Sequence, residues 1–188
     1  GACTHAESTF VSIGAFAFYK TPALVSVSFE LGSALASIGN YAFAASSALQ
    51  SINIPPEISS IPFYCFSSCF SLTSVEFMNG GGNFMIISEG AFVNTGLMSF
   101  DVPRSVETID TAAFANCTSL VEIRFLCQCD AIIAFDAFKG SAITAVELPE
   151  TCTFTPSSSL TVTQQDCSAP TPSPTLAPVA VPTYVPTF

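Results

Sequence analysis

The stretch IDTAAFANCTSLVEIRF, residues 109–125, decides the fold, because its pattern recurs six times along the chain of 188 residues. Each copy begins with an isoleucine, has an Ala-Phe or Cys-Phe pair starting four residues later, and continues into a run of alternating apolar and polar residues. The phenylalanines of these pairs lie 22 to 26 residues apart and are Phe18, Phe43, Phe66, Phe92, Phe114 and Phe138. The chain is therefore a tandem array of one short unit.

This period predicts a leucine-rich-repeat solenoid of six coils over residues 11–149. A leucine-rich unit of about 20–29 residues builds a stack in which no coil can bury its own core alone. In each coil we expect a short β-strand, such as residues 26–29, with its apolar side chains turned inward. The Ala-Phe pair is expected in a short helical or turn segment on the opposite side. Phe66 and Phe114 should then be almost fully buried as plugs between coils.

Residues 109–123, and the shorter run AFVNTGL at residues 91–97, resemble BspA-like (Treponema-type) leucine-rich repeats. The resemblance covers roughly residues 9–150. Proteins of that family are typically secreted or surface proteins of bacteria and microbial eukaryotes with roles in adhesion and protein binding, so the resemblance implies such a role and carries over no catalytic residue. The chain departs from the family pattern in two ways: the family's cysteine position is filled only at Cys69 and Cys117, and the third repeat carries the insertion Asn79–Asn83.

The chain divides into four segments. Residues 1–10 form a short lead-in, and residues 11–149 are the six coils. Residues 150–167 are polar and contain two cysteines, which is compatible with a partial seventh coil. From residue 168 to residue 188 the composition changes to Pro, Thr and Ser, which excludes a helix or a central strand and predicts an extended tail.

Composition excludes several classes of function. Four Lys and Arg residues against fourteen Asp and Glu residues give a net charge of −10, which argues against nucleic-acid binding, because phosphate affinity comes from clustered cations. No apolar run reaches the roughly 18 residues of a membrane helix, so no membrane insertion is expected. From the residues at the start we expect no signal peptide and a mature, processed form that begins at Gly1. His5 is the only histidine, so neither an enzyme nor a cofactor is expected.

Eight cysteines without zinc-type spacing indicate a secreted, disulfide-forming protein. Cys129 and Cys152 occupy the same phase of adjacent coils, where backbones lie about 5 Å apart, and we predict a disulfide between them. Cys69 and Cys117 share a phase but lie two coils apart, so they should not bond to each other. Cys65 remains open between a small buried residue and a bridged one.

The outward strand positions form two columns along the predicted stack. The first is mostly serine, and the second is Ser28, Asn53, Glu76, Asp101, Arg124 and Glu147. Adjacent coils should place these side chains about 4.8 Å apart, so Glu76 would stack on Asp101, and Arg124 would offset Asp101 and Glu147. A solvated polar ladder is expected. A weak calcium site at Glu76 and Asp101 is the alternative, although two carboxylates leave most of the 6–8 ligands unsupplied.

The sequence contains candidate glycosylation sites. Asn116 lies in the sequon Asn-Cys-Thr, but the same residue could simply be the turn residue of its repeat. Thr/Pro-rich tails of this kind resemble those on extracellular proteins of microbial algae, where such positions often carry O-linked sugars. The corresponding candidates here are Thr171, Ser173, Thr175, Thr183 and Thr187.

Two functions follow from these patterns, both extracellular. The first is a structural subunit that polymerises head to tail into a fibre or coat, because a poorly capped stack can bury its ends against another copy. In that hypothesis the tail contacts neighbouring copies through Leu176, Val179, Val181, Tyr184, Val185 and Phe188. The second is an adhesion module whose exposed sheet face holds a protein or glycan partner.

Overall fold

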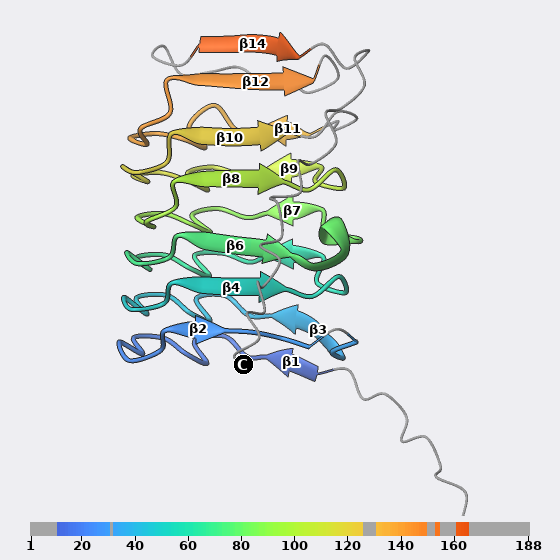
Figure 1. Cartoon of the computed structure of the whole chain (residues 1–188), viewed down its shortest axis with the longest axis vertical. Coiled ribbons are helices and arrows are strands. Elements are labelled where there is room, and N and C mark those ends of the chain that lie inside the picture. The colour runs from blue at the N-terminus through green and yellow to red at the C-terminus, as the bar shows by residue number, and fades with distance from the viewer. Residues whose placement is uncertain (1–10, 31, 126–130, 150–152, 155–160, 166–188) are drawn as a thin grey trace, which may run out of the picture.

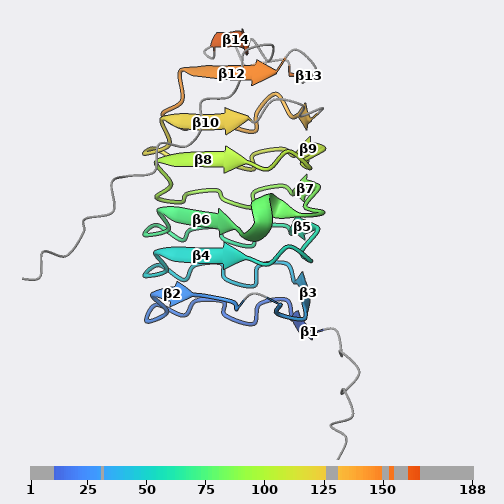
Figure 2. The ribbon, with the colours of Figure 1, turned by 45° about the vertical axis from the view of Figure 1, so that its right-hand side comes forward.

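The computed structural model describes residues 11–30, 32–125, 131–149, 153–154 and 161–165. The described chain winds into stacked coils, and all its paired strands run parallel. The leucine-rich-repeat solenoid is therefore confirmed. Each coil contributes strands to two rows (Figures 1 and 2).

The first row forms what we call the front face, which is turned to the viewer in Figure 1. Its strands are β2 (Ser26–Val27), β4 (Ser51–Ile54), β6 (Ser74–Phe77), β8 (Ser99–Val102), β10 (Glu122–Phe125), β12 (Ala145–Pro149) and β14 (Thr161–Gln165). The second row lies at the right in Figure 2 and consists of β1 (Val11–Ile13), β3 (Leu35–Ile38), β5 (Ser60–Ile61), β7 (Ile86–Ile87), β9 (Thr108–Ile109), β11 (Ile132–Ile133) and β13 (Thr153–Phe154). Because β13 pairs with β11 and β14 with β12, both rows continue beyond residue 149.

The Ala-Phe pairs lie in turns, so the helical alternative is not found there. Two of the turn's N–H groups, those of Phe16 and Phe18, donate to carbonyls of the next coil at 3.0 and 2.6 Å. The N–H of Ala17, between them, bonds within its own coil to Gly14. A helix would direct every N–H along its own axis, and the left-handed φ of +60° at Phe16 also excludes one. Among the described residues the only helix is the 3₁₀ turn η1 (Met78–Gly81).

The core is a ladder of phenylalanine rings, one from each coil. Successive rings from Phe18 to Phe138 are stacked with centroids 5.1 to 5.6 Å apart. Phe66 and Phe114 are fully buried, as predicted. The residue before each of them is also fully buried, and at Cys65 this small position is filled by a free thiol. The ladder therefore supplies contact between every pair of adjacent coils.

The front face is interrupted between β6 and β8. The strands β2, β4 and β6 form one sheet and β8, β10, β12 and β14 another, whereas β5, β7, β9, β11 and β13 form a continuous sheet in the second row. The expected stacking of Glu76 on Asp101 in one uninterrupted column is therefore wrong. Coils three and four stay joined elsewhere, for example by the Phe66 N–H bond to the Ala91 carbonyl at 2.9 Å.

The insertion in the third repeat lies at this interruption. It forms η1 and the residues just after it, whose glycines pack tightly against prolines of the neighbouring coils. A Cβ on Gly81 would lie 2.6 Å from the Cβ of Pro103, and a Cβ on Gly82 would lie 2.6 Å from the Pro56 carbonyl oxygen. Inside the stack, Phe77 and Phe100 meet edge to face at 5.9 Å. The inserted turn therefore packs against the residues that follow β4 and β8, beside the point where β6 and β8 do not pair.

Candidate binding surface on the front face

The interruption holds a cavity of about 360 Å³. It is lined by Val75, Glu76, Phe77, Gly80, Asp101, Val102 and Pro103. Val75 and Phe77 are half-buried there, whereas Ile52 and Ile54, their register partners on β4, are buried. The interruption therefore gives solvent access to apolar side chains that an intact stack would cover.

A smaller hollow of about 180 Å³ continues along the same face. It is lined by Val27, Ser28, Ser51, Ile52, Asn53, Ser74 and Glu76. Glu76 borders both hollows. Together they form a polar and apolar strip along β4, β6 and β8, which we call the front cleft.

Arg124 organises the charges beside the front cleft. Its guanidinium donates to both carboxylate oxygens of Glu122, at 2.8 and 2.7 Å, and to Asp101 at 3.1 Å. These hydrogen bonds raise the pKa of Arg124, with Glu122 as the larger cause. Because all three side chains are exposed, each pair contributes at most about 1 kcal/mol.

The expected pairing of Arg124 with Glu147 is not found. The two residues are register partners on β10 and β12, but among the described residues the ion pairs of Arg124 are those with Asp101 and Glu122. Glu122 lies two residues before Arg124 on the same strand. Both of its carboxylate oxygens accept hydrogen bonds from the guanidinium, so Glu122 is the partner in place of Glu147. Glu76 has no cationic partner among the described residues.

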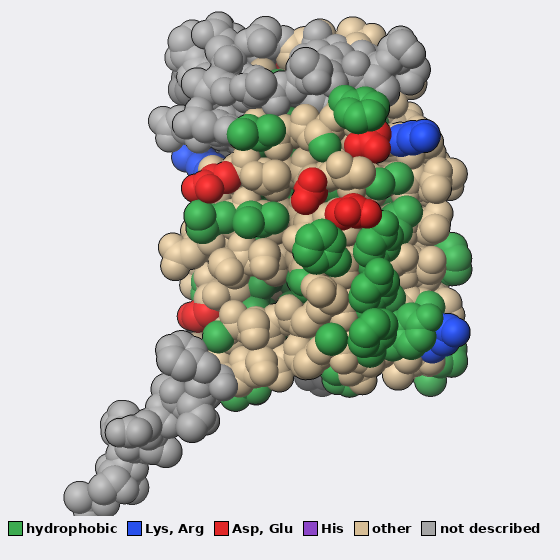
Figure 3. Space-filling view, turned by 180° about the vertical axis from the view of Figure 1, so that it is seen from behind, with side chains coloured by type: hydrophobic (Ala, Val, Ile, Leu, Met, Phe, Trp, Pro, Cys, Tyr) green, Lys and Arg blue, Asp and Glu red, His purple; other side chains and the backbone are tan. Residues whose placement is uncertain are grey.

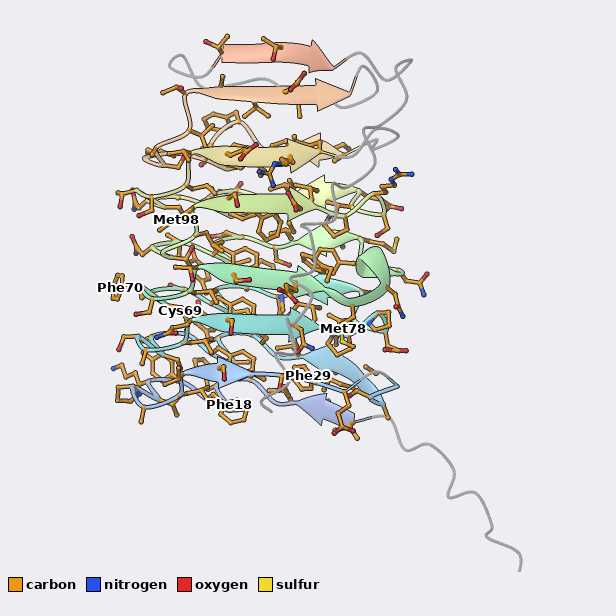
Figure 4. The ribbon with its side chains drawn as sticks, viewed as in Figure 1. Phe18, Phe29, Cys69, Phe70, Met78 and Met98 are labelled. Carbon is orange, nitrogen blue, oxygen red and sulfur yellow. The ribbon has the colours of Figure 1, made fainter. Side chains whose placement is uncertain are left out.

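Asn53 was predicted to lie on the exposed sheet face, and its side chain there also bonds to the backbone of the neighbouring coil. Its side-chain amide accepts from the Phe29 N–H at 2.7 Å and donates to the Phe29 carbonyl at 2.9 Å. The same amide nitrogen lies 3.5 Å from the sulfur of Met78, which Figure 4 labels together with Phe29. Since β2 ends at Val27, the Asn53 amide replaces the strand pairing that stops there. Ser28, its neighbour in the column, is exposed.

The sequence offered two roles for Asn116, a glycosylation site or the turn residue of its repeat, and the structure places it in the turn. Its φ is +56°, and the corresponding residues Asn94 and Gly140 are also left-handed. A Cβ on Gly140 would lie 2.4 Å from the Asn116 side-chain oxygen. The Asn116 side chain is exposed. Glycosylation at this residue stays a prediction.

Several predicted site residues lie outside the described residues. They are the cysteines of the expected disulfide, Cys129 and Cys152; the O-glycosylation candidates Thr171, Ser173, Thr175, Thr183 and Thr187; and the tail residues Leu176, Val179, Val181, Tyr184, Val185 and Phe188. His5 lies outside them as well.

Cys65, Cys69 and Cys117 are buried free thiols, and burial raises the pKa of each, that of Cys69 to about 12. We therefore expect none of them to react with iodoacetamide in the folded protein at mildly alkaline pH, because the thiolate is the reactive form. Peptide mass spectrometry after labelling checks this. The same three residues must label after unfolding in guanidinium chloride, and native labelling of any of them would contradict the packing described here.

A second ladder of aromatic rings, not anticipated from the sequence, lies on the outside of the turns. Phe16, Tyr41 and Tyr64 are stacked with centroids 5.0 and 5.3 Å apart. The Tyr64 hydroxyl donates to Glu89 at 2.8 Å, which raises the pKa of Tyr64. Figure 3 shows hydrophobic side chains gathered along one side of the lower coils on the rear of the molecule. The recurrence of an aromatic residue two positions before three of the core phenylalanines is the sequence signal for this ladder.

The end of the stack at coil one is open among the described residues. Phe18, at the bottom of the core ladder in Figure 4, is 37% exposed although the equivalent Phe43 is fully buried. The carbonyls of Asn40, Ala42 and Ala44 accept bonds from coil one, but no described donor bonds to the equivalent carbonyls one coil earlier. Gly14 shares its repeat position with Gly39, and a Cβ on it would meet nothing within 4 Å. We call this surface the coil-one end face.

The described residues hold no group of three or more His, Cys, Asp or Glu side chains placed to bind a metal ion. They also contain no helix of the length and apolarity needed to span a bilayer.

Comparisons with known proteins agree with this architecture. The sequence matches the BspA type leucine rich repeat region, in six copies, over residues 4–121 and 85–165. A search of curated proteins found no match.

Among solved structures, a leucine-rich repeat protein from Eubacterium ventriosum is 29% identical with a TM-score of 0.62, and the match covers 70% of this chain and 34% of that one. A leucine-rich repeat protein from Bacteroides ovatus is 20% identical with a TM-score of 0.58, covering 82% of this chain and 55% of that one. The pneumococcal vaccine antigen PcpA is 23% identical with a TM-score of 0.56, covering 62% of this chain and 31% of that one. The likeness to the Bacteroides ovatus and pneumococcal proteins is one of fold alone. This chain spans 55% or less of the length of each of the three proteins.

Proposed function

Because this chain belongs to the BspA-type leucine-rich-repeat family, we propose that it is a secreted or cell-surface protein that holds a protein or glycan partner against its front face and catalyses no reaction. The observation that carries the proposal is the front cleft, where half-buried apolar side chains, the unpaired carboxylate of Glu76 and the exposed carboxylate of Asp101 are accessible together. Stacked coils present such a face as one extended surface, which suits a macromolecular partner. The net charge of −10 disfavours nucleic acid as that partner.

A bulky substitution on the front face should block this binding. Ser99 is exposed at the start of β8, and we expect Ser99→Arg to weaken binding to an array of purified extracellular-matrix proteins and glycans at least tenfold, about 1.4 kcal/mol. Thr111→Arg, at an exposed position in the turn that follows β9, is the matched control and should bind like the parent chain. Absence of any partner on the array, or equal binding by both variants, would contradict the proposal.

The coil-one end face favours a second function, end-to-end self-assembly into a fibre or coat. Its unpaired carbonyls, the exposed ring of Phe18 and the open space at Gly14 match what coil two offers to coil one. A stack whose end accepts another coil can continue into a second copy, and such a head-to-tail contact propagates. Residues 168–188 would contact the neighbouring copies.

Gly14→Ala tests this assembly without disturbing the single chain. In the isolated chain the new methyl group meets nothing, whereas at the same repeat position a Cβ on Gly39 would lie 2.3 Å from the Ala15 nitrogen. We expect light scattering and negative-stain microscopy to show fibres for the parent chain and monomers for Gly14→Ala, with an unchanged melting temperature.

Deletion of residues 168–188 should also leave the coils folded and abolish fibres. Fibres that persist in either variant would show that the corresponding contact is not used.

A further inference from the structure

Two of the strands that line the front cleft, β6 and β8, are sheet edges. β6 pairs with β4 on one side only, and β8 pairs with β10 on one side only, so the edges that face each other have no strand partner among the described residues. An unpaired parallel edge presents a row of backbone donors and acceptors, which is the feature that peptides use when they add a strand to a sheet.

The apolar lining supports an occupant that is itself a peptide. Val75 and Phe77 on β6 are half-buried, while Val102 and Pro103 at the end of β8 are buried. Side chains of an added strand alternate between the two faces of the sheet, so those pointing inward would cover Val75 and Phe77. Removing this apolar area from water favours binding.

The charges beside the front cleft select the partner. Glu76 and Asp101 occupy outward positions on the two bordering strands, and Glu76 has no cationic partner among the described residues. Asp101 shares the single guanidinium of Arg124 with Glu122, so this group of three carboxylates and one cation keeps a negative charge. A bare metal ion would find few oxygen ligands here, because calcium needs 6–8. A Lys or Arg side chain supplies one positive charge and several donors.

We propose that the front cleft binds one extended segment of a partner protein as an added β-strand, with a Lys or Arg side chain placed between Glu76 and Asp101. This inference rests on the proposed binding function and names the partner for it. The chain's own residues 168–188 are a poor occupant, because they contain no Lys or Arg and their six prolines lack the N–H groups that a strand edge requires.

Synthetic peptides test the proposal on the full chain. The probe is a fluorescein-labelled peptide of alternating Thr and Val with one central Lys, compared with the same peptide carrying Gln in place of Lys. We expect the Lys peptide to bind at least tenfold more tightly than the Gln peptide by fluorescence anisotropy, with a preference that falls as salt is added. Hydrogen exchange should show protection of the backbone amides of residues 74–77 and 99–102 on binding.

Matched variants assign the effect to the two carboxylates. Glu76→Gln combined with Asp101→Asn should abolish the preference for the Lys peptide, whereas Glu147→Gln, in the same column but within the intact sheet, should retain it. Circular dichroism and thermal melting check that each variant is folded. If the double variant does not fold, Glu76→Gln alone takes its place and should lose part of the preference for the Lys peptide.

Three results would overturn the proposal: equal binding of the Lys and Gln peptides, protection confined to other strands, or tighter binding of a peptide of residues 168–188. The array experiment separates this inference from the proposed function. If Ser99→Arg abolishes partner binding while Glu76→Gln with Asp101→Asn leaves it intact, the front face remains the binding surface and the added strand is wrong.

Discussion

Phe66→Ala and Phe114→Ala should each lower the free energy of unfolding by about 3–5 kcal/mol. Both rings are fully buried, and each stacks on a ring above it and a ring below it, with centroids 5.2 to 5.6 Å apart. Truncation leaves a cavity between two coils that the rigid backbone ladder cannot close, because the turn N–H groups on either side stay bonded to the next coil. Chemical denaturation followed by circular dichroism measures the loss.

Phe70→Ala is the control for this measurement. Phe70 is 63% exposed and lies at the left edge of the stack in Figure 4. Its removal should change the free energy of unfolding by no more than about 0.5 kcal/mol. Unchanged melting of Phe66→Ala or Phe114→Ala would mean that the ladder is not the main source of cohesion between coils.

Gly39→Ala should cost about 1–3 kcal/mol or more, because the new methyl group must push two coils apart. Its Cβ would lie 2.3 Å from the nitrogen and 2.7 Å from the Cα of Ala15, both of which are backbone atoms. The Gly39 N–H also donates to the Ile13 carbonyl at 2.8 Å, and this bond would be strained by any separation.

Gly14→Ala, at the same position of the preceding repeat, should be neutral or should stabilise the single chain by about 0.4–1 kcal/mol, since alanine restricts the unfolded state. Thermal denaturation of the two variants side by side, at a concentration at which the chain is monomeric, makes the comparison. Equal destabilisation by both substitutions would show that another segment already covers the coil-one end face.

The sequence predicted the features that carry a strong repeated pattern and missed those with a weak pattern or none. The Phe ladder and the inward and outward positions of the strands followed from a period that every coil obeys. The break between β6 and β8 comes at an insertion whose Gly81 and Gly82 contact prolines in two other coils, and no local pattern reveals these contacts. The outward position of Arg124 on its strand was predicted correctly. Its ion pair with Glu122 rather than Glu147 depends on the rotamer of an exposed side chain, which the repeat pattern does not fix.

The second strand of each coil was missed for a related reason. The residues of β5, β7, β9 and β11 number two each, so they are too short to show alternation. Asn53 was assigned to the exposed face because it occupies an outward position of the repeat, and its Cβ does lie on that face. Its amide then turns to the Phe29 backbone, a contact that arises only because β2 stops after two residues.

The interrupted front face also affects how the molecule unfolds. A repeat stack behaves approximately as a row of units coupled to their nearest neighbours, and its cooperativity depends on the weakest coupling. Coils three and four are joined by their turns and by the second row of strands, but they lack the strand pairing that unites β4 with β6 and β8 with β10. We therefore expect denaturation to separate the molecule into two cooperative blocks at this interface, and a pulling force applied to the two ends of the stack to open it there first.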